Sequence, residues 1–448
     1  MGDPVSDIPV REGRHRKPIH LGAHFPGVNN TTVWKVPEAG SQIDFTSFEH
    51  LAQVAEDAKF DFFFLAEGLR LREHLGRIHD LDVVGRPDTF GVLAALAAVT
   101  DRLGLAGTIN TTFNEPFEVA RQFATLDHLS DGRAAWNMVT SSDAFTGENF
   151  RRGGFLAHAD RYRRAGEFVT VAREFWDAWD DHGPHRVVHR GDYFAVDGYP
   201  VLPPGPQGRP VLLQAGDSAD GREFAAAHAD AIFTRHGTLD AGREFYADVG
   251  RRAAARGRNP EHLKVFPAAT FVLGDSAAEA DEKARHIRRL QVGPQTAINF
   301  LEQVWGSDLS GYDPDGPLPR EDPTFDAVTL GRTRQGDPRE IAARYRDRAE
   351  ADGLSIRELV IEMTSRQQFV GTPESVADEI DRYVQADACD GFILVPHLTP
   401  TGLDDFAADV VPILQERGAF RSEYAGTTLR DHLGLPPVDA AGAGRATG

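Results

Sequence analysis

The chain has 448 residues, of which 41% are hydrophobic, and a formal net charge of −20 at pH 7. This length allows two average domains or one elaborated α/β barrel, and the hydrophobic fraction is ample for a large core. The acidic balance excludes a nucleic-acid-binding protein, because binding a polyanion needs concentrated positive charge.

No apolar stretch approaches the ~20 residues of a membrane-spanning helix. Residues 1–17 lack the apolar centre of a signal peptide. The single cysteine, Cys389, excludes an intramolecular disulfide and fits a reducing compartment. We therefore expect a cytoplasmic protein that contacts no membrane.

Eight short segments, apolar or rich in β-branched residues, are predicted to be strands. In chain order they are His20–Phe25, Phe60–Ala66, Leu105–Asn110, Ala134–Val139, Val211–Ala215, Ala231–Thr234, Lys264–Leu273 and Asp390–Pro396. Segments with helical periodicity separate them. These helices are Phe45–Ala58, Phe90–Thr100, Pro116–Leu129, Ala159–Trp179, Arg222–Ala229, Ala241–Arg256, Ser276–Leu290, Gly371–Val384 and Leu403–Arg417. The alternation favours a single TIM-type (β/α)8 barrel over a doubly wound sheet, and no G-x-G-x-x-G follows a strand as a Rossmann domain requires.

We expect the barrel to occupy residues 18–435, between flexible tails at 1–17 and 436–448. Two stretches interrupt the alternation and are interpreted as insertions. Residues 182–201 contain HRGDYFAVDG, which is typical of a small hairpin. Residues 306–338 are rich in Gly, Pro and Asp and have no sustained period. A segment of this length is either an active-site lid or a surface excursion, and the sequence leaves both open.

Several kinds of catalytic site are excluded by what the sequence lacks. It contains no HExxH, no P-loop and no G-x-S-x-G elbow, and Cys389 has no partner for a thiolate zinc site. His182, His185 and His189 crowd one stretch, but Gly183-Pro184 prevents them from sharing a helix face. We interpret them as surface histidines and assign no metal, no serine nucleophile and no general base.

Polar residues gather where predicted parallel strands end, which is where ligands bind in α/β folds. Glu67 follows the second strand, Thr111 follows the third, and Asn137, Thr140 and Ser141 close the fourth. Each of these also has a plain structural explanation, as a helix cap or a solvated loop residue.

Gly216–Gly221 lies between a strand and a helix, so its backbone N–H groups are predicted to face an anion such as phosphate. His158 and Tyr162, four residues apart, share one face of the long helix that precedes this strand, and taken alone they are better explained as an ordinary surface or packing pair.

Long stretches of the chain match a known family. They are FDFFFLAEG, RPDTFGVLAALAAVTDRLGL, NTTFNEPFEVARQFATLDHLSDGRAAWNMVTS, HADRYRRAGEF, FWDAW, QAGDSADG, GTPESVADEI, DGFIL and VVPILQERGAFRSEYAGTTLRDHLGL. In these stretches, which span roughly residues 19–435, the chain resembles the bacterial-luciferase-like flavin monooxygenases. It is most similar to the branch with the nitrilotriacetate, dibenzothiophene-sulfone and long-chain alkane monooxygenases.

The resemblance implies a two-component enzyme that receives reduced FMN from a separate NAD(P)H-dependent flavin reductase. Reduced FMN and O2 form a 4a-hydroperoxide, which transfers one oxygen atom to a small organic substrate. The motif positions imply that Thr111 and Asn137 bind the flavin ring with Thr140 and Ser141 nearby, and that Ala66 lies beneath it. His158, Tyr162, Ser218 and Gly221 would surround the phosphate. Two positions depart from the family pattern, since Glu67 stands where Asp is usual and Asp217 where Ser is usual.

The loop after the first strand, with His24, Asn30 and Trp34, is expected to line the substrate side. The resemblance also implies a homodimer or homotetramer. Two alternatives stay open: a deazaflavin-dependent enzyme that transfers hydride on the same barrel, and a non-catalytic flavin-binding protein.

Overall fold

The computed structural model describes residues 16–27, 31–69, 71, 73–74, 77–78, 86–140, 149–150, 158–324, 337–364 and 367–438. Two predicted site residues, Asn30 and Ser141, lie outside these ranges, as does the side chain of His158. Among the described residues, no helix combines the length and apolar character needed to cross a bilayer.

Eight parallel strands close into a barrel, as predicted. They are β1 (His20–His24), β2 (Phe62–Leu65), β5 (Gly104–Asn110), β6 (Ala134–Val139), β11 (Val211–Ala215), β12 (Ala231–Thr234), β13 (Lys264–Leu273) and β15 (Gly391–Leu394). Each pairs with the next in this order, β12 pairs with β13, and β15 returns to β1. Closure leaves this sheet without a free edge.

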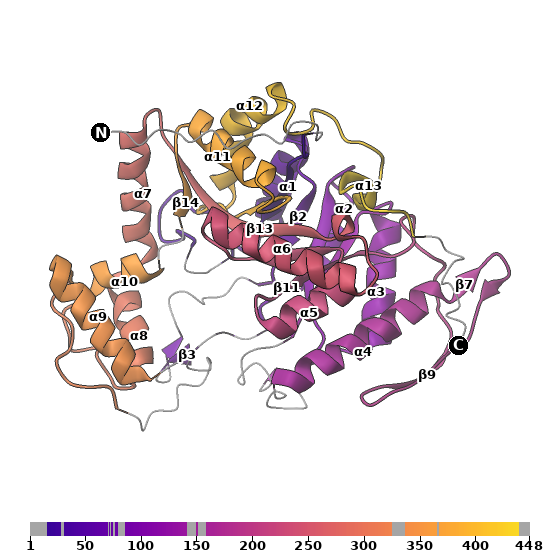
Figure 1. Cartoon of the computed structure of the whole chain (residues 1–448), viewed down its shortest axis with the longest axis horizontal. Coiled ribbons are helices and arrows are strands. Elements are labelled where there is room, and N and C mark those ends of the chain that lie inside the picture. The colour runs from indigo at the N-terminus through magenta and orange to yellow at the C-terminus, as the bar shows by residue number, and fades with distance from the viewer. Residues whose placement is uncertain are drawn as a thin grey trace.

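Helices alternate with the strands and form the outer layer (Figure 1). They are α1 (Phe45–Asp57), α2 (Thr89–Ala97), α3 (Pro116–Leu129), α4 (His158–Asp177), α5 (Ala219–His228), α6 (Leu239–Ala255), α11 (Pro373–Gln385) and α12 (Val411–Glu416). The side chains between the strands and these helices make one continuous apolar core. Local signals set the helix starts: the Asp88 carboxylate accepts a hydrogen bond from the Gly91 N–H at 2.8 Å, and Pro116 opens α3.

The inside of the barrel is filled by a second cluster that includes Phe62, Phe64 and Phe266. Its amino-terminal end is closed by the short helix α13 (Leu429–His432), from which Leu429 reaches the cluster. Fully buried Asp61 at the same end accepts hydrogen bonds from the Leu21 N–H and from Arg421. This end is therefore sealed, and a ligand has access only at the carboxyl ends of the strands.

A second packing unit stands beside the barrel. It contains α8 (Pro294–Trp305), α9 (Pro338–Asp352) and α10 (Ile356–Thr364), which share a small core around Leu301, Trp305 and Leu359. It follows α7 (Ala277–Gln291) and precedes β14 (Gln367–Gly371), which extends the sheet along the end of β13. Figure 1 shows the unit on the opposite side of the molecule from α4.

Small two-stranded ribbons complete the fold. The predicted hairpin is present as β9 (Val187–Arg190) paired with β10 (Ala195–Gly198). It follows a shorter pair, β7 (Trp179–Asp180) and β8 (Gly183–Pro184). A third ribbon, β3 (Glu73–His74) with β4 (Arg77–Ile78), follows β2.

Two helix predictions were wrong in part. The segment Leu403–Arg417 is helical from 404 to 416 but irregular: a 3₁₀ turn at Thr401–Leu403 leads into it, and its stretch Phe406–Val410 is π-helical before α12. Pro412 explains the irregularity, because it has no N–H to continue the ladder of hydrogen bonds. Gly371 belongs to β14, and α11 begins only at Pro373, where the Thr372 hydroxyl caps the Ser375 N–H.

Candidate active site

The barrel interior changes from apolar to polar near the carboxyl ends of β5 and β6. Thr108 and Asn137 face each other in register across these strands, and Asn137 Nδ2 donates to Thr108 Oγ1 at 2.9 Å. Asn137 is 3% exposed, and its Oδ1 accepts no hydrogen bond within the described part of the chain. A buried amide oxygen without a donor is costly. It is therefore suited to accept a hydrogen bond from a ligand.

Glu67 and Asn110 join the ends of β2 and β5. One carboxylate oxygen, Glu67 Oε2, accepts from both the N–H and the Nδ2 of Asn110, at 3.1 and 3.0 Å. Asn110 Oδ1 in turn accepts from the Thr112 and Phe113 N–H groups. Burial raises the pKa of Glu67 to about 7, and the negative charge of Asp88 adds to this effect. The Glu67 side chain thus holds the loop that begins at Thr111.

Thr111 lies at the start of that loop and is 1% exposed. Its N–H donates to the Val139 carbonyl at 2.9 Å and its hydroxyl does so at 3.2 Å, which ties the loop to the end of β6. Thr140 follows Val139 and is half-buried. Ala66 is half-buried and packs on the interior cluster below the Glu67–Asn110 pair.

The turn between β11 and α5 forms a narrow cradle against Tyr162. A Cβ built on Gly216 would lie 3.1 Å from the Tyr162 hydroxyl, and one on Gly221 would lie 3.0 Å from it. Ser218 is the N-cap of α5, and its hydroxyl accepts from the Gly221 N–H at 3.1 Å. The start of a helix, two glycines and a tyrosine hydroxyl are suited to hold a phosphate.

Asp217 lies in this turn, where a carboxylate would repel an anion. Its Oδ1 accepts a hydrogen bond from the Thr234 hydroxyl at 2.6 Å, so the carboxylate is directed toward the end of β12. The departure from the family pattern at this position is therefore compatible with a phosphate in the cradle.

His24, at the end of β1, belongs to a stack of three rings across the barrel. Its ring lies 5.4 Å from that of Phe64, which lies 5.3 Å from the ring of Phe233. His24 is 8% exposed, and its Nδ1 has no hydrogen-bond partner in the described structure. Burial lowers the pKa of His24 to about 3, with a further lowering from the charges of Arg86 and Arg235. The imidazole is therefore neutral at physiological pH.

Trp34, the third substrate-side prediction, is half-buried beside Lys35.

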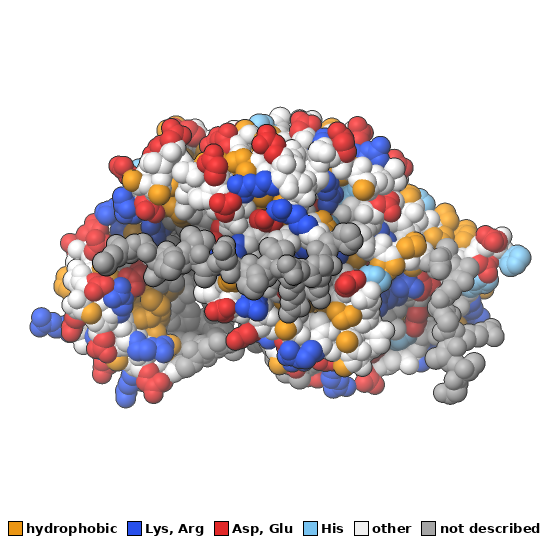
Figure 2. All heavy atoms as spheres, turned by 45° about the horizontal axis from the view of Figure 1, so that its top comes forward, with side chains coloured by type: hydrophobic (Ala, Val, Ile, Leu, Met, Phe, Trp, Pro, Cys, Tyr) orange, Lys and Arg blue, Asp and Glu red, His pale blue; other side chains and the backbone are white. Residues whose placement is uncertain are grey.

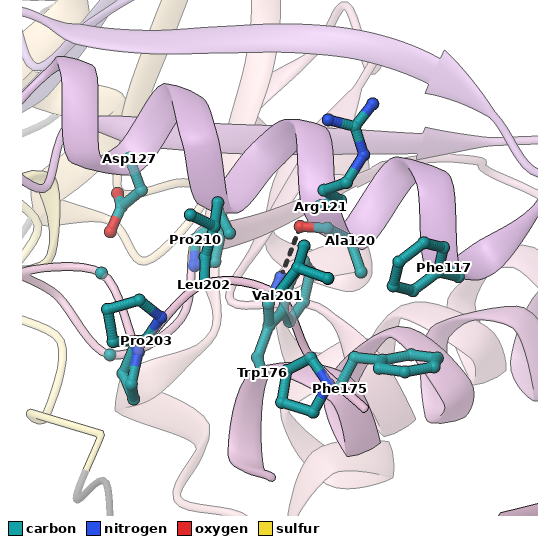
Figure 3. Close-up of a pocket in the computed structure, with 15 residues that line it drawn as sticks. Phe117, Ala120, Arg121, Asp127, Phe175, Trp176, Val201, Leu202, Pro203 and Pro210 are labelled. Carbon is teal, nitrogen blue, oxygen red and sulfur yellow. Dashed lines mark hydrogen bonds between the residues drawn. The ribbon is translucent and has the colours of Figure 1, made fainter. Parts of the chain in front are cut away.

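A partly apolar pocket lies elsewhere, on the outer surface of the barrel (Figure 3). It is formed by α3, the end of α4 and the loop 200–210, with Phe117, Phe175 and Trp176 in its wall. Trp176 Nε1 donates to the Ala120 carbonyl there, so the one indole donor is already satisfied. The pocket offers no polar group from the strand ends, and we do not assign the active site to it.

The three clustered histidines belong to the ribbons beyond α4. His185 pairs with Asp180 at 2.8 Å, and His189 lies between Glu174 and Glu167 at 3.2 and 3.4 Å. Glu167 also accepts from the N–H groups of the β9–β10 turn. These contacts give His185 and His189 structural roles, and His189, whose side chain is 14% exposed, is not the surface residue expected from the sequence. No metal-binding group of three or more His, Cys, Asp or Glu occurs among the described residues.

Comparison with known proteins identifies the family. The model of the luciferase-like monooxygenases matches residues 28–389. The chain belongs to this family. It is 39% identical to N-acetyl-S-(2-succino)cysteine monooxygenase from Bacillus subtilis (strain 168), over 94% of this chain and 97% of that protein. It is 37% identical to nitrilotriacetate monooxygenase component A from Aminobacter aminovorans, over 92% and 94% of the two chains.

Comparison with solved structures leads to the same family. EDTA monooxygenase from Chelativorans sp. BNC1 is 30% identical, with a TM-score of 0.73 over 94% of this chain and 99% of that one. Riboflavin lyase, solved with a modified FMN and riboflavin, is 31% identical, with a TM-score of 0.76 over 94% and 97%. Two F420-dependent enzymes are only 15% identical, and their likeness shows the fold alone.

This luciferase-like monooxygenase is thus a two-component, FMN-dependent oxidoreductase, which uses reduced FMN from a separate reductase to activate O2. The described residues fit FMN on two independent observations. One is the Asn137 oxygen without a donor, and the other is the glycine cradle beneath Tyr162.

Sequence reasoning missed Thr108, Asn110, Phe64 and Phe233. Strand alternation was the available signal, because Thr108 and Asn110 occupy the same face of β5 as buried Ala106. The two phenylalanines lie in continuous apolar runs. Such runs do not show which residues face the barrel interior and which face the surrounding helices.

Proposed function

We propose that FMN lies across the ends of β5, β6 and β11, with its ring beside Asn137 and Thr111 and its phosphate in the cradle. The pairing of β6 with β11 supports this, since Leu213 is in register with Asn137 and the cradle begins three residues further along. In this placement Tyr162, Ser218 and Gly221 bind the phosphate, with His158 as a further expected contact, and Thr140 and Ser141 lie near the ring. Ala66 and Glu67 lie on the ring side.

The observation that carries this placement is the close approach of the Tyr162 hydroxyl to Gly216 and Gly221. Losing a hydrogen bond to a charged group costs about 1.5–3 kcal/mol. Tyr162→Phe and Ser218→Ala should each weaken binding of reduced FMN by roughly tenfold or more, measured by anaerobic titration.

Ser218 also caps α5, so its variant needs a matched control. Thr238 caps the neighbouring helix α6 in the same way, accepting from the Ala241 N–H at 3.3 Å. Thr238→Ala should lose a similar cap while keeping wild-type affinity for reduced FMN. If Tyr162→Phe and Ser218→Ala both bind like the control, the phosphate lies elsewhere.

The chain has no dinucleotide-binding fingerprint of its own. With NADH and FMN alone it should therefore consume no NADH until a flavin reductase is added. NADH oxidation by the purified monooxygenase alone would contradict the two-component assignment.

We further propose a homodimer or homotetramer in the cytoplasm. Individual apolar side chains on the outer surface, such as Leu129 and Val201 at 59% exposure each, are available for contacts between subunits. Buried Cys389 is compatible with a reducing compartment. A monomer mass in light scattering would overturn the oligomer.

The substrate is expected to bind on the side of the ring bounded by His24 and Trp34. Two of the relatives named above act on N-acetyl-S-(2-succino)cysteine and nitrilotriacetate, compounds with several carboxylates. Others are named for dibenzothiophene sulfone and long-chain alkanes, which carry none. Family membership alone therefore leaves the substrate class open.

A further inference from the structure

Three elements, two neighbouring strands and one across the barrel from them, bring polar and cationic groups to the barrel mouth. His24 ends β1, Arg86 lies over the turn after β2, and Arg235 follows β12 directly. The His24–Phe64–Phe233 ring stack links these elements, since the rings come from β1, β2 and β12. The side chains that follow the stack toward solvent therefore face the same mouth, from both sides of it.

Arg86 is held in place by backbone contacts. Its Nη1 donates to the Glu67 carbonyl at 3.2 Å. A Cβ on Gly68 would overlap the Arg86 side chain, so the glycine leaves the space in which this arginine crosses the end of β2. Arg86 Nε also lies 4.0 Å from where a Cβ of Gly27 would be, which places the guanidinium beside the turn after β1.

Arg235 differs from most arginines of this chain, because it makes no hydrogen bond or ion pair within the described ranges. By strand alternation it occupies the same face of its segment as Phe233 and Ala231, whose side chains fill the barrel interior. The positive charges of Arg235 and Arg86 both lower the pKa of the His24 imidazole. An arginine at the rim of an active site without a carboxylate partner is suited to a carboxylate of a ligand.

His24 supplies the second, independent observation. It is more than nine-tenths buried, and its Nδ1 has no hydrogen-bond partner among the described residues. A neutral imidazole carries one N–H and one acceptor nitrogen. With two cations nearby, the ligand atom that satisfies it best is an anionic oxygen that accepts the N–H.

We propose that His24, Arg86 and Arg235 form a carboxylate-binding subsite, so that the substrate is a small organic acid whose carboxylate docks here. The inference rests on the proposed function, which places the flavin ring next to this rim. Two acidic groups at the strand ends are held by other partners: Glu67 is directed to Asn110, and Asp217 is directed to Thr234. Figure 2 shows charged side chains of both signs spread over one face of the molecule.

The test compares an acid with its neutral ester. The probes are nitrilotriacetate and its trimethyl ester, and N-acetyl-S-(2-succino)cysteine and its trimethyl ester, each given to the full chain with reductase, NADH, FMN and O2. Binding of the two acids to the protein without turnover is measured in parallel by calorimetry. The variants are Arg235→Gln and, as a matched control, Arg251→Gln, whose side chain is 70% exposed on α6.

We expect Arg235→Gln to weaken the binding of at least one acid tenfold or more and to raise the KM for that acid by a similar factor. The KM values for the esters and the affinity for reduced FMN should stay within twofold of the wild type. Arg235→Lys should restore part of the loss, and Arg251→Gln should match the wild type.

The subsite is overturned if wild-type protein binds neither acid, or if it has the same KM for the acids as for their esters. It is also overturned if Arg235→Gln leaves acid binding unchanged or weakens acids, esters and reduced FMN equally. Failure of the proposed function looks different: reduced FMN would not bind, or no probe, acid or ester, would yield an O2-dependent product.

Discussion

At the residue scale, Glu67 is a carboxyl at the barrel mouth whose pKa is strongly altered by the fold. Its pKa is raised to about 7 by burial, whereas the unfolded chain has the ordinary value of 4.5. The folded protein therefore holds a proton that the unfolded chain releases. The contribution of this carboxyl to stability is most favourable below pH 4.5 and is lost as the pH rises through 7.

Replacement by glutamine removes this titration and keeps an oxygen acceptor for Asn110. The free energy of unfolding of the wild type, relative to Glu67→Gln, should fall by up to about 3 kcal/mol between pH 5 and pH 8, since each pKa unit corresponds to about 1.4 kcal/mol. Denaturant titrations at several pH values measure it. Exposed Glu279, whose pKa is lowered by Lys283 and the Asp275 N–H, is the control: Glu279→Gln should show no such slope. Parallel profiles for wild type and Glu67→Gln would contradict a raised pKa.

Thr108 tests the buried polar pair at the mouth. Thr108→Val keeps the shape of the side chain but leaves Asn137 Nδ2 without its acceptor. An unsatisfied buried donor costs about 1–3 kcal/mol, so the variant should unfold at lower denaturant concentration and bind reduced FMN more weakly. Wild-type stability together with wild-type affinity would show that the pair does not orient Asn137.

The residue-scale comparison shows where sequence reasoning reached its limit. Motif resemblance supplied Thr111, Asn137, Tyr162 and Ser218, and the structure brings their strands and turns to one end of the barrel. Asn110 was missed because its role depends on a carboxylate 43 positions earlier in the chain. Contacts between the ends of different strands depend on how the barrel closes, and a local sequence pattern does not show which strand ends meet.

At the element scale, the strands were predictable and the additional helices were not. All eight barrel strands coincide with apolar runs, since a strand buried on both faces must be apolar throughout. By contrast, α8, α9 and α10 were not predicted, although Pro294 and Pro338 at their starts are ordinary helix-opening signals. They pack on one another instead of on the barrel, so their pattern did not fit the barrel repeat.

The segment 306–338 illustrates the same point. Residues 306–324 contain no helix or strand, whereas Asp337 and Pro338 at the end of the segment cap and open α9. The part 306–324 wraps around Trp305: Trp305 Nε1 donates to the Glu321 carbonyl at 2.9 Å, and Arg346 donates to the Pro319 carbonyl. This part is anchored to α8 and α9. Residues 325–336 lie outside the described ranges, and the expected lid stays a prediction.

Trp305 is therefore expected to hold the helical unit together. Removing a buried tryptophan costs about 3–5 kcal/mol, so Trp305→Ala should lower hydrogen-exchange protection across 294–364. Protection of the barrel strands should be retained. Trp305→Phe, which keeps one aromatic ring but loses the Nε1 donor and part of the indole volume, should have a smaller effect. Equal loss of protection in β5 and β6 would show that the unit and the barrel unfold as one.

At the scale of the whole molecule, the barrel has one sealed end and one polar mouth, and the proposed phosphate cradle lies at that mouth. These three features together support one activity. The sealed end follows from Asp61 and α13, and the cradle follows from the turn after β11. The protein contributes binding and shielding, while reduced FMN supplies the reaction with O2. What the sequence alone leaves open is the substrate, because loops and rim residues from separate strands define it.

The most direct test of the central claim is a single-turnover experiment with ¹⁸O₂. The full chain is mixed with chemically reduced FMN and the acid and ester probes, without NADH and without a reductase, and the products are analysed by mass. The account predicts product carrying one ¹⁸O atom, formed only when both reduced FMN and O2 are present. Oxidised product formed without O2, or product free of the label, would contradict a monooxygenase and favour hydride transfer on the same barrel.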